Sequence, residues 1–169
     1  MSERVDIAVI GPPGVEVASF LRTISDVTIT LGAETPGRST YVGRITIDDG
    51  LVLRLLGSLD GMAEDETSRS LIGAVLLVDP SASSWLQEAQ AGLAALDRAA
   101  VDAIAVGVKW NGSRADEPLR IRDLMGLPDS VPMVDVVTSD RDSVKEVILS
   151  LLYVCLEDSE TTRIRAIAR

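Results

Sequence analysis

The first stretch of this sequence with the spacing of a reactive site is Gly11 to Ser19, GPPGVEVAS, which follows the apolar run VDIAVI. A phosphate-binding loop has the order Gly, four residues, Gly, Lys and then Ser or Thr, placed between a strand and a helix. Its glycines let backbone N–H groups turn inward, its lysine reaches the outer phosphates, and its hydroxyl group binds magnesium. Gly11 fits the first position of this frame, Gly14 is one of the four residues after it, and the residues that follow decide whether a phosphate can be held.

The positions that would contact the phosphates carry the wrong side chains. Glu16 stands at the second glycine position, Val17 at the lysine position and Ala18 at the hydroxyl position, before Ser19. A carboxylate about 4 Å from one phosphate charge costs roughly 4 kcal/mol at an effective dielectric constant of about 20. Neither of the two lysines in the chain follows a glycine, so no other register restores the motif. The stretch predicts the outline of a phosphate loop without its chemistry.

The elements around this loop follow an alternating pattern. Apolar runs bounded by Gly, Pro or Asp alternate with longer amphipathic stretches, which is typical of an α/β fold. The predicted strands cover residues 5–10, 39–47, 51–56, 74–78, 103–108 and 133–137, and the predicted helices cover residues 15–25, 84–99, 119–125 and 142–156. The turn signal at residues 48–50, DDG, makes the second and third strands an antiparallel hairpin. We expect a mostly parallel six-stranded sheet with one antiparallel hairpin strand and helices on both faces.

Two segments lack a clear period. Residues 26–40, DVTITLGAETPGRST, are rich in Thr and Gly, and we expect a loop there. The end of the chain, EDSETTRIRAIAR, is polar and then arginine-rich, so we expect one domain over residues 1–157 and a flexible tail over residues 158–169. A short amphipathic segment that contacts a membrane or a partner is the alternative interpretation of this tail.

Composition narrows the classes of ligand and partner. The 169 residues suffice for one domain, and a net charge of −10 disfavours nucleic acid and anionic lipid surfaces. The chain has no histidine, the usual zinc ligand and neutral-pH general base, so we expect no metal site. The single cysteine excludes an internal disulfide. No apolar run approaches the roughly 20 residues that span a bilayer, and we expect a cytoplasmic protein without stable membrane insertion.

Several stretches together resemble the Ras-like small GTPases of bacteria, namely the gliding-motility switch GTPases and, more closely, the conservon GTPase-like proteins of actinobacteria. The resemblance extends to about Leu156. It rests on the loop at Gly11 and on the stretches GRSTYVGRITIDDGLVLRLLGS, SLIGAVLLVDPS, AIAVGVKWNG and VVTSDRDSVKEVILSLL. It implies the Ras-like P-loop fold, with a first switch at the threonine of GRST and a second switch after the hairpin.

The functional positions of this family are mostly changed. The switch threonine would be Thr40, which is present, whereas the Asp-x-x-Gly of the second switch falls on Gly57 to Asp60, without the magnesium-side carboxylate. Conservon proteins also have Gly at that first position. The base-reading Asn-Lys-x-Asp falls on Val108 to Asn111 and keeps only Lys109. Since the amide of Asn111 presents donors to the donors of the guanine edge, we expect guanine selectivity to be lost.

The resemblance and these losses together predict a pseudo-GTPase, a protein-interaction and signalling module that is not an enzyme and has no cofactor. The implied partners are a roadblock-type regulatory protein and, through it, a sensor-kinase-like protein. We expect the switch segments, about 32–40 and 58–68, to be mobile until a partner orders them.

One alternative is an atypical small GTPase, a slow GTP hydrolase that binds GTP or GDP with magnesium and still engages Thr40, Ser19 and Lys109. Another is an unrelated enzyme on an α/β sheet, for which the sequence offers only scattered carboxylates such as MAEDE at residues 62–66.

Overall fold

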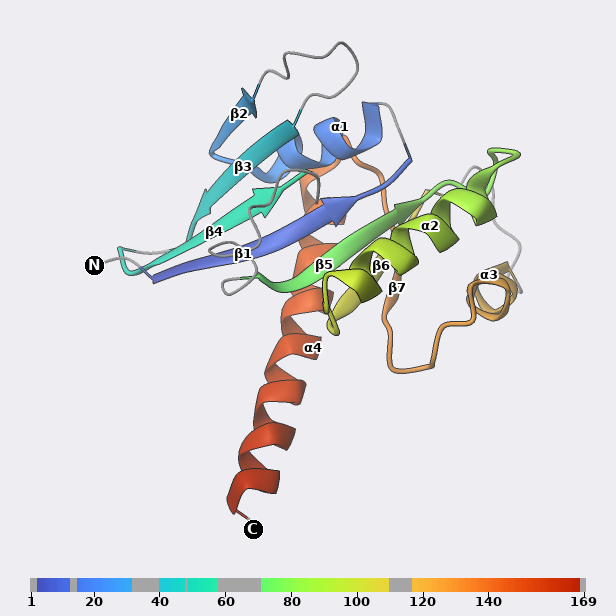
Figure 1. Ribbon diagram of the computed structural model, residues 1–169. Helices are drawn as coiled ribbons and strands as arrows, with labels where there is room; N and C mark the ends of the chain where they lie inside the picture. Colours follow the sequence, from blue (N-terminus) through green and yellow to red (C-terminus); the bar gives the residue numbers. More distant parts are fainter. Residues whose placement is uncertain are drawn as a thin grey trace.

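The computed structural model describes residues 3–12, 15–31, 40–47, 49–57, 71–109 and 117–167. In this part, seven strands form one sheet in the order β2-β3-β4-β1-β5-β6-β7 (Figure 1). The strands are β1 (Glu3–Ile10), β2 (Val27–Leu31), β3 (Thr40–Thr46), β4 (Leu51–Leu56), β5 (Leu71–Val78), β6 (Ile104–Val108) and β7 (Met133–Asp135). The helices are α1 (Val15–Ile24), α2 (Trp85–Arg98), α3 (Glu117–Met125) and α4 (Arg141–Ile167).

The sheet is mostly parallel. Strands β4, β1, β5, β6 and β7 run in one direction, and β3 is antiparallel to both β2 and β4. The central strands β5 (LIGAVLLV) and β6 (IAVGV) are apolar along nearly their whole length, as expected of parallel strands that are covered on both faces. The predicted α/β class and the predicted β3–β4 hairpin are confirmed.

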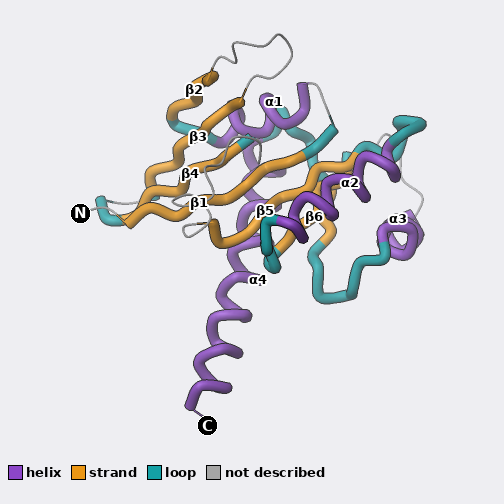
Figure 2. The backbone as a smooth tube through the Cα atoms, viewed as in Figure 1, coloured by secondary structure: helices purple, strands orange, loops and turns teal. Residues whose placement is uncertain are grey.

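Helices cover both faces of the sheet, as predicted. Ile7 and Val9 of β1 are buried in a core cluster with side chains of α1 and α4. Ala8, which lies between them and points to the other face, is buried with Leu96 of α2. Helices α2 and α3 therefore share one face, and α1 and α4 share the opposite face. The C-terminal half of α4 continues past the edge of the body (Figure 2).

Two expectations about the elements are wrong. The first is the loop over residues 26–40, because Val27–Leu31 form the edge strand β2, which raises the strand count from six to seven. The sequence VTITL is rich in β-branched residues and alternates apolar with polar side chains, the pattern of a strand, and β3 supplies its antiparallel partner. The second is the helix end at Leu156, since α4 continues to Ile167. Residues 142–169 contain no Gly or Pro to stop the helix.

Several sequence predictions lie outside the described residues. They include residues 32–39 and 58–70, which hold most of the two expected switch segments and the MAEDE stretch, as well as Gly14, Asn111 and the side chain of Thr40. None of the helices in the described part of the chain is long and apolar enough to span a membrane.

Candidate functional site

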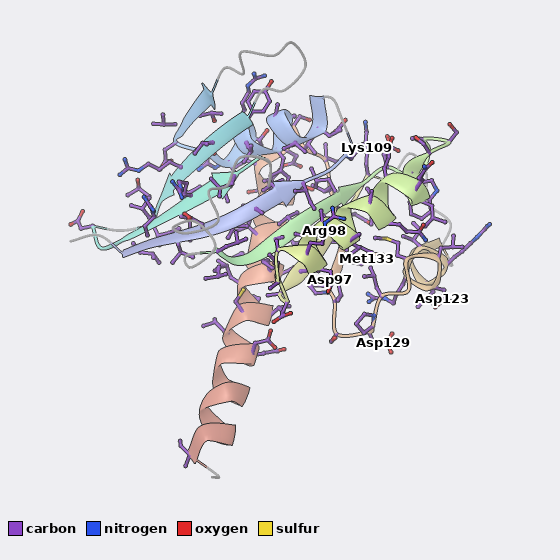
Figure 3. All side chains as sticks on the ribbon, in the orientation of Figure 1. Asp97, Arg98, Lys109, Asp123, Asp129 and Met133 are labelled. Atoms are coloured by element: carbon purple, nitrogen blue, oxygen red, sulfur yellow. The ribbon has the colours of Figure 1, made fainter. Side chains whose placement is uncertain are left out.

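Four chain segments meet at one edge of the sheet. Because β1, β5, β6 and β7 are parallel, their carboxyl ends lie at the same edge, where α/β proteins bind ligands. Gly11 follows β1, Asp79 follows β5 and Thr138 comes shortly after β7. Lys109, labelled in Figure 3, follows β6. Helix α1 begins beside them and contributes Glu16 in its first turn.

The carboxylate of Glu16 joins these segments. Its Oε1 atom accepts a hydrogen bond from Nζ of Lys109 at 2.6 Å, and its Oε2 atom accepts one from Oγ1 of Thr138 at 2.7 Å. Asp79 Oδ2 lies 4.0 Å from the same Lys109 nitrogen. Glu16, which the sequence analysis aligned with a phosphate-loop glycine, is therefore bonded to Lys109, which it aligned with the lysine of a base motif.

This ion pair stabilises the charged form of both partners. The Lys109 hydrogen bond holds the pKa of Glu16 below its ordinary value, even though partial burial acts in the opposite direction. The same bond raises the pKa of Lys109 above its ordinary value. The side chains of Lys109 and Glu16 are 38% and 27% exposed, so solvent screens part of their attraction.

The loop that follows β7 is held by protein groups. Thr23 of α1 donates its hydroxyl to the backbone oxygen of Thr138 at 2.6 Å. The backbone N–H of Val137 donates to Oγ of Ser143 at 2.9 Å, and that of Val136 donates to the backbone oxygen of Val108. Contacts with α1, α4 and β6 thus hold this loop.

The space between these segments is nearly filled. A cavity of about 10 Å³ remains among Pro12, Glu16, Leu77, Val78, Asp79, Gly107, Lys109, Val136 and Thr138. This volume is about what a single water molecule needs. Among the described residues, Glu16, Lys109 and Thr138 therefore enclose space for little more than one water molecule.

The positions that would bind phosphate and magnesium belong to the core. Val17 and Ala18, at the lysine and hydroxyl positions, are only 8% and 4% exposed. Val17 lies close to Gly11, where an added Cβ atom would be 3.2 Å from Cγ2 of Val17 and 3.1 Å from Cβ of Leu77. Ser19 is partly buried. Burial of the apolar side chains of Val17 and Ala18 helps to dock α1 against the sheet.

Gly57, at the position of the magnesium-side carboxylate, also has no room for a side chain. Its backbone N–H donates to the oxygen of Tyr41 at 2.8 Å. An added Cβ atom would lie 2.9 Å from Cδ1 of Leu21 and 3.0 Å from the oxygen of Tyr41. An aspartate at this position would therefore require the hairpin or α1 to shift.

A larger hollow of about 240 Å³ lies beside the site, between the ends of β1 and β5 and helix α2. Its walls are mainly apolar and include Trp85, and its two acidic residues are Asp79 and Glu88. Two carboxylates disfavour a phosphate group in this hollow. No cluster of three or more His, Cys, Asp or Glu side chains suited to a metal ion occurs among the described residues.

The structure brings together only some of the sequence-predicted site residues. Gly11, Glu16 and Lys109 meet at the site, whereas Thr40 begins β3, two strands away from β1 in the sheet. Sequence reasoning named neither Thr138 nor Thr23 as a site residue. The signal for Thr138 was its stretch VVTSD, which the resemblance places after the last strand.

Comparisons with known proteins concern the fold. No protein-family model and no curated protein matches the sequence. A similar solved structure is the G domain of the T. maritima FeoB iron transporter, with a TM-score of 0.59 and 13% identity over 90% of this chain and 99% of that one. The cytosolic domain of the same transporter in a GDP form matches with a TM-score of 0.53 and 12% identity, over 90% of this chain and 64% of that one. The chain therefore has the α/β fold of small GTPase G domains.

Proposed function

We propose that this protein is a pseudo-GTPase, a G-domain fold that acts as a protein-interaction and signalling module with little or no GTP binding or hydrolysis. The observation that carries the proposal is the ion pair of Glu16 with Lys109, together with the Thr138 hydrogen bond. In the GTPases that this chain resembles, the nucleotide connects the phosphate loop with the base motif. Here one carboxylate of the chain makes that connection.

Electrostatics opposes nucleotide binding at this edge. A phosphate group near Glu16 would meet a charge of the same sign, at a cost of roughly 4 kcal/mol for each phosphate charge at about 4 Å. Asp79 adds a second carboxylate beside the same lysine. A nucleotide would also have to separate Glu16 from Lys109 before the base could approach that lysine.

The partners and the location follow from the resemblance. We propose a roadblock-type regulatory protein as direct partner, a sensor-kinase-like protein beyond it, and a cytoplasmic site of action. The net charge of −10 supports a protein partner over a nucleic acid.

A second candidate function is an atypical small GTPase that binds GTP or GDP with magnesium and hydrolyses GTP slowly. The observation in its favour is Lys109, which is retained and positioned at the carboxyl edge of the sheet. In this reading Glu16 would have to leave Lys109 when a nucleotide enters, which makes Glu16 the residue that separates the two candidates.

Titration of the purified chain with fluorescent GDP and GTP, with and without magnesium, tests the proposal. We expect no binding tighter than micromolar for the native chain. The matched variant is Glu16→Gly, which removes the carboxylate and restores the family's glycine. This variant should also bind GDP and GTP weakly, because Val17 and Ala18 still stand at the lysine and hydroxyl positions. Micromolar or tighter affinity of the native chain, or nucleotide retained through purification, would establish the atypical GTPase instead.

A further inference from the structure

The hollow between β5 and α2 lies beside the ion pair at the carboxyl edge of the sheet. It has a volume of about 240 Å³. Pockets for drug-sized ligands usually measure roughly 300–1,000 Å³, so this hollow has room for one small organic molecule or one side chain. Neither Glu16 nor Lys109 lines it, so it is separate from the contact that carries the proposed function.

One end of this hollow is apolar. Trp85 and Gly92 of α2 are separated by about two helical turns, so they share the helix face that lines the hollow. An added Cβ atom at Gly92 would lie 2.8 Å from Cδ1 of Leu76 and 3.5 Å from Cδ1 of Ile10, so α2 packs closely against β5 and β1 at this point. The end of the hollow beside Gly92 is therefore suited to an apolar group.

Two carboxylates line the other end, at the carboxyl edge of the sheet. Asp79 follows β5, and Glu88 lies in the first turn of α2. Ser84 donates its hydroxyl to Oε1 of Glu88 at 2.8 Å, and Ser81 donates both its backbone N–H and its hydroxyl to Oδ1 of Asp79. Among the described residues, no hydrogen-bond donor reaches the second oxygen of either carboxylate. Both of these oxygens can therefore accept hydrogen bonds from a ligand.

The charge at the acidic end is not balanced by the described residues that line the hollow. They include no lysine or arginine, and no basic side chain in the described part of the chain forms a salt bridge with Glu88. Lys109 lies 4.0 Å from Oδ2 of Asp79, but its charge is balanced by the hydrogen bond to Glu16 at 2.6 Å. The acidic end should therefore attract a positively charged ligand group and repel a phosphate or a carboxylate.

We propose that this hollow binds a small organic cation, an ammonium or guanidinium group that is attached to an apolar body. The cationic group lies beside Asp79 and Glu88, whose free oxygens accept its hydrogen bonds. The apolar body lies against Leu76 and Ile10. Trp85 lines the same hollow, and an indole ring is the most favourable aromatic partner for a cation. A free amine and the arginine side chain of a partner protein share this chemistry.

Titration of the isotope-labelled full chain with phenethylamine, followed by NMR, tests the proposal. The matched probes are phenethyl alcohol, which is neutral, and hydrocinnamate, which is anionic. We expect phenethylamine to give saturable shifts of the amide signals of residues 85–92 and of the Trp85 indole, with a Kd of about 1–10 mM. The other two probes should bind about tenfold more weakly or not at all. A Trp110→Phe chain identifies the Trp85 indole signal, because the chain has two tryptophans. Equal binding of the amine and the alcohol would overturn the proposal.

The role of the carboxylates is tested with Glu88→Gln, which removes the charge and keeps an oxygen acceptor for Ser84. We expect this variant to weaken phenethylamine binding about fivefold, because the carboxylate is only partly exposed. The matched control is Asp97→Asn in the last turn of the same helix, labelled in Figure 3, since Asp97 is exposed and does not line the hollow. The control should change the Kd by less than about twofold. Equal weakening by the two variants would indicate a general attraction to an acidic chain and would overturn the proposal.

The location of the site is tested by a second pair of variants on α2. Ala91 and Ala94 are both exposed, but only Ala91 lines the hollow. Ala91→Leu takes up part of the space and should weaken phenethylamine binding about threefold or more, whereas Ala94→Leu should leave it unchanged. Equal Kd values for the two variants would place the amine outside the hollow and contradict the proposal.

The source of the cation is tested with N-acetyl-arginine amide, whose only charge is on its side chain. Tighter binding of this probe than of phenethylamine would assign the hollow to the arginine side chain of a partner protein, and the reverse order would assign it to a free amine. The absence of saturable shifts with both probes would overturn the proposal.

Discussion

Glu16 Oε1 and Lys109 Nζ lie 2.6 Å apart, although the two residues are separated by 93 positions in the chain. The resemblance aligns Glu16 with a phosphate loop and Lys109 with a base motif, and a single ion pair joins the two residues. In a nucleotide-binding relative these two positions would be free to contact opposite ends of a ligand. Here they contact each other, and the consequences can be measured as stability, as pH dependence and as indifference to nucleotide.

The first prediction concerns the strength of this ion pair. We expect Glu16→Gln and Lys109→Met each to lower the free energy of unfolding by about 1 kcal/mol, because each leaves a partly buried charge with fewer partners. A double-mutant cycle should give a coupling energy of about 0.5–1 kcal/mol. Lys145→Met, at an exposed position of α4, is the control and should change stability by less than about 0.5 kcal/mol. A coupling energy indistinguishable from zero would mean that the pair has no part in holding the site closed.

The second prediction concerns pH. Since the pKa of Glu16 is lowered in the folded state, its stabilisation is present above the ordinary pKa of 4.5 and is lost as the pH falls through the folded value. Lys109, whose pKa is raised, contributes fully below 10.5 and loses its contribution as the pH rises above that value. Urea unfolding between about pH 3 and 7 should show a steeper acid-side loss of stability in the native chain than in Glu16→Gln. Parallel pH profiles for the two proteins would contradict this assignment.

Local sequence patterns predicted most of the elements because their signals are short-range. The β3–β4 hairpin follows from two strand-like runs around a DDG turn, and the central strands follow from continuous apolar runs. The expectation of a loop over residues 26–40 rests on the Thr and Gly content of the whole stretch and overlooks the strand pattern of VTITL, which β3 stabilises as its antiparallel partner. The expected helix end at Leu156 rests on the polar residues that follow it, although none of them breaks a helix.

The site was predictable only in part. The sequence predicted that Glu16 would repel a phosphate, because it places a carboxylate at the second glycine position of the phosphate-loop pattern. It did not show where the carboxylate points, because Thr138 lies 122 positions away and only the parallel order of the strands brings it near. Pairings of this kind depend on topology, which neither periodicity nor motif spacing contains.

The third prediction concerns Asp6, a fully buried carboxylate in the centre of the sheet. Arg54 of the neighbouring strand β4 donates two hydrogen bonds to it, from Nε to Oδ1 at 2.9 Å and from Nη2 to Oδ2 at 2.6 Å. Arg54→Met should cost about 3–5 kcal/mol of unfolding free energy, because it removes the main partner of a buried charge. Arg44→Met is the matched control, since Arg44 pairs with Arg54 across β3 and β4 but is exposed. Equal effects of the two variants would show that the Asp6 contact carries little stability.

The fourth prediction concerns repair of the phosphate loop. Val17→Lys restores the lysine of the motif, yet position 17 is packed in the core with α1 and the sheet. We expect this variant to lose stability by more than about 2 kcal/mol, because it places an ammonium group among apolar side chains, and to gain no measurable affinity for GTP. Ala18→Ser, which restores only a hydroxyl group, serves as the milder comparison. Micromolar GTP binding by Val17→Lys would mean that the remaining parts of the site are competent.

The last prediction concerns the proposed signalling partner. In an active GTPase the outer phosphate and its magnesium ion order the switch segments, so partner affinity follows the nucleotide. Here protein groups make these contacts: Thr23 and Glu16 bind the loop after β7, and Lys109 binds the first turn of α1. The affinity for a roadblock-type partner should therefore be the same with GTP, GDP or neither, and with or without magnesium.

Calorimetric titrations under each condition measure this affinity directly. The control variant is Glu16→Gln, which weakens the contact with Lys109 while it leaves the surface shape nearly unchanged. A tenfold difference between GDP and GTP would correspond to about 1.4 kcal/mol of coupling and would show that a nucleotide still controls the domain. Loss of partner binding in Glu16→Gln without any nucleotide effect would show the opposite, that the ion pair itself maintains the binding-competent state.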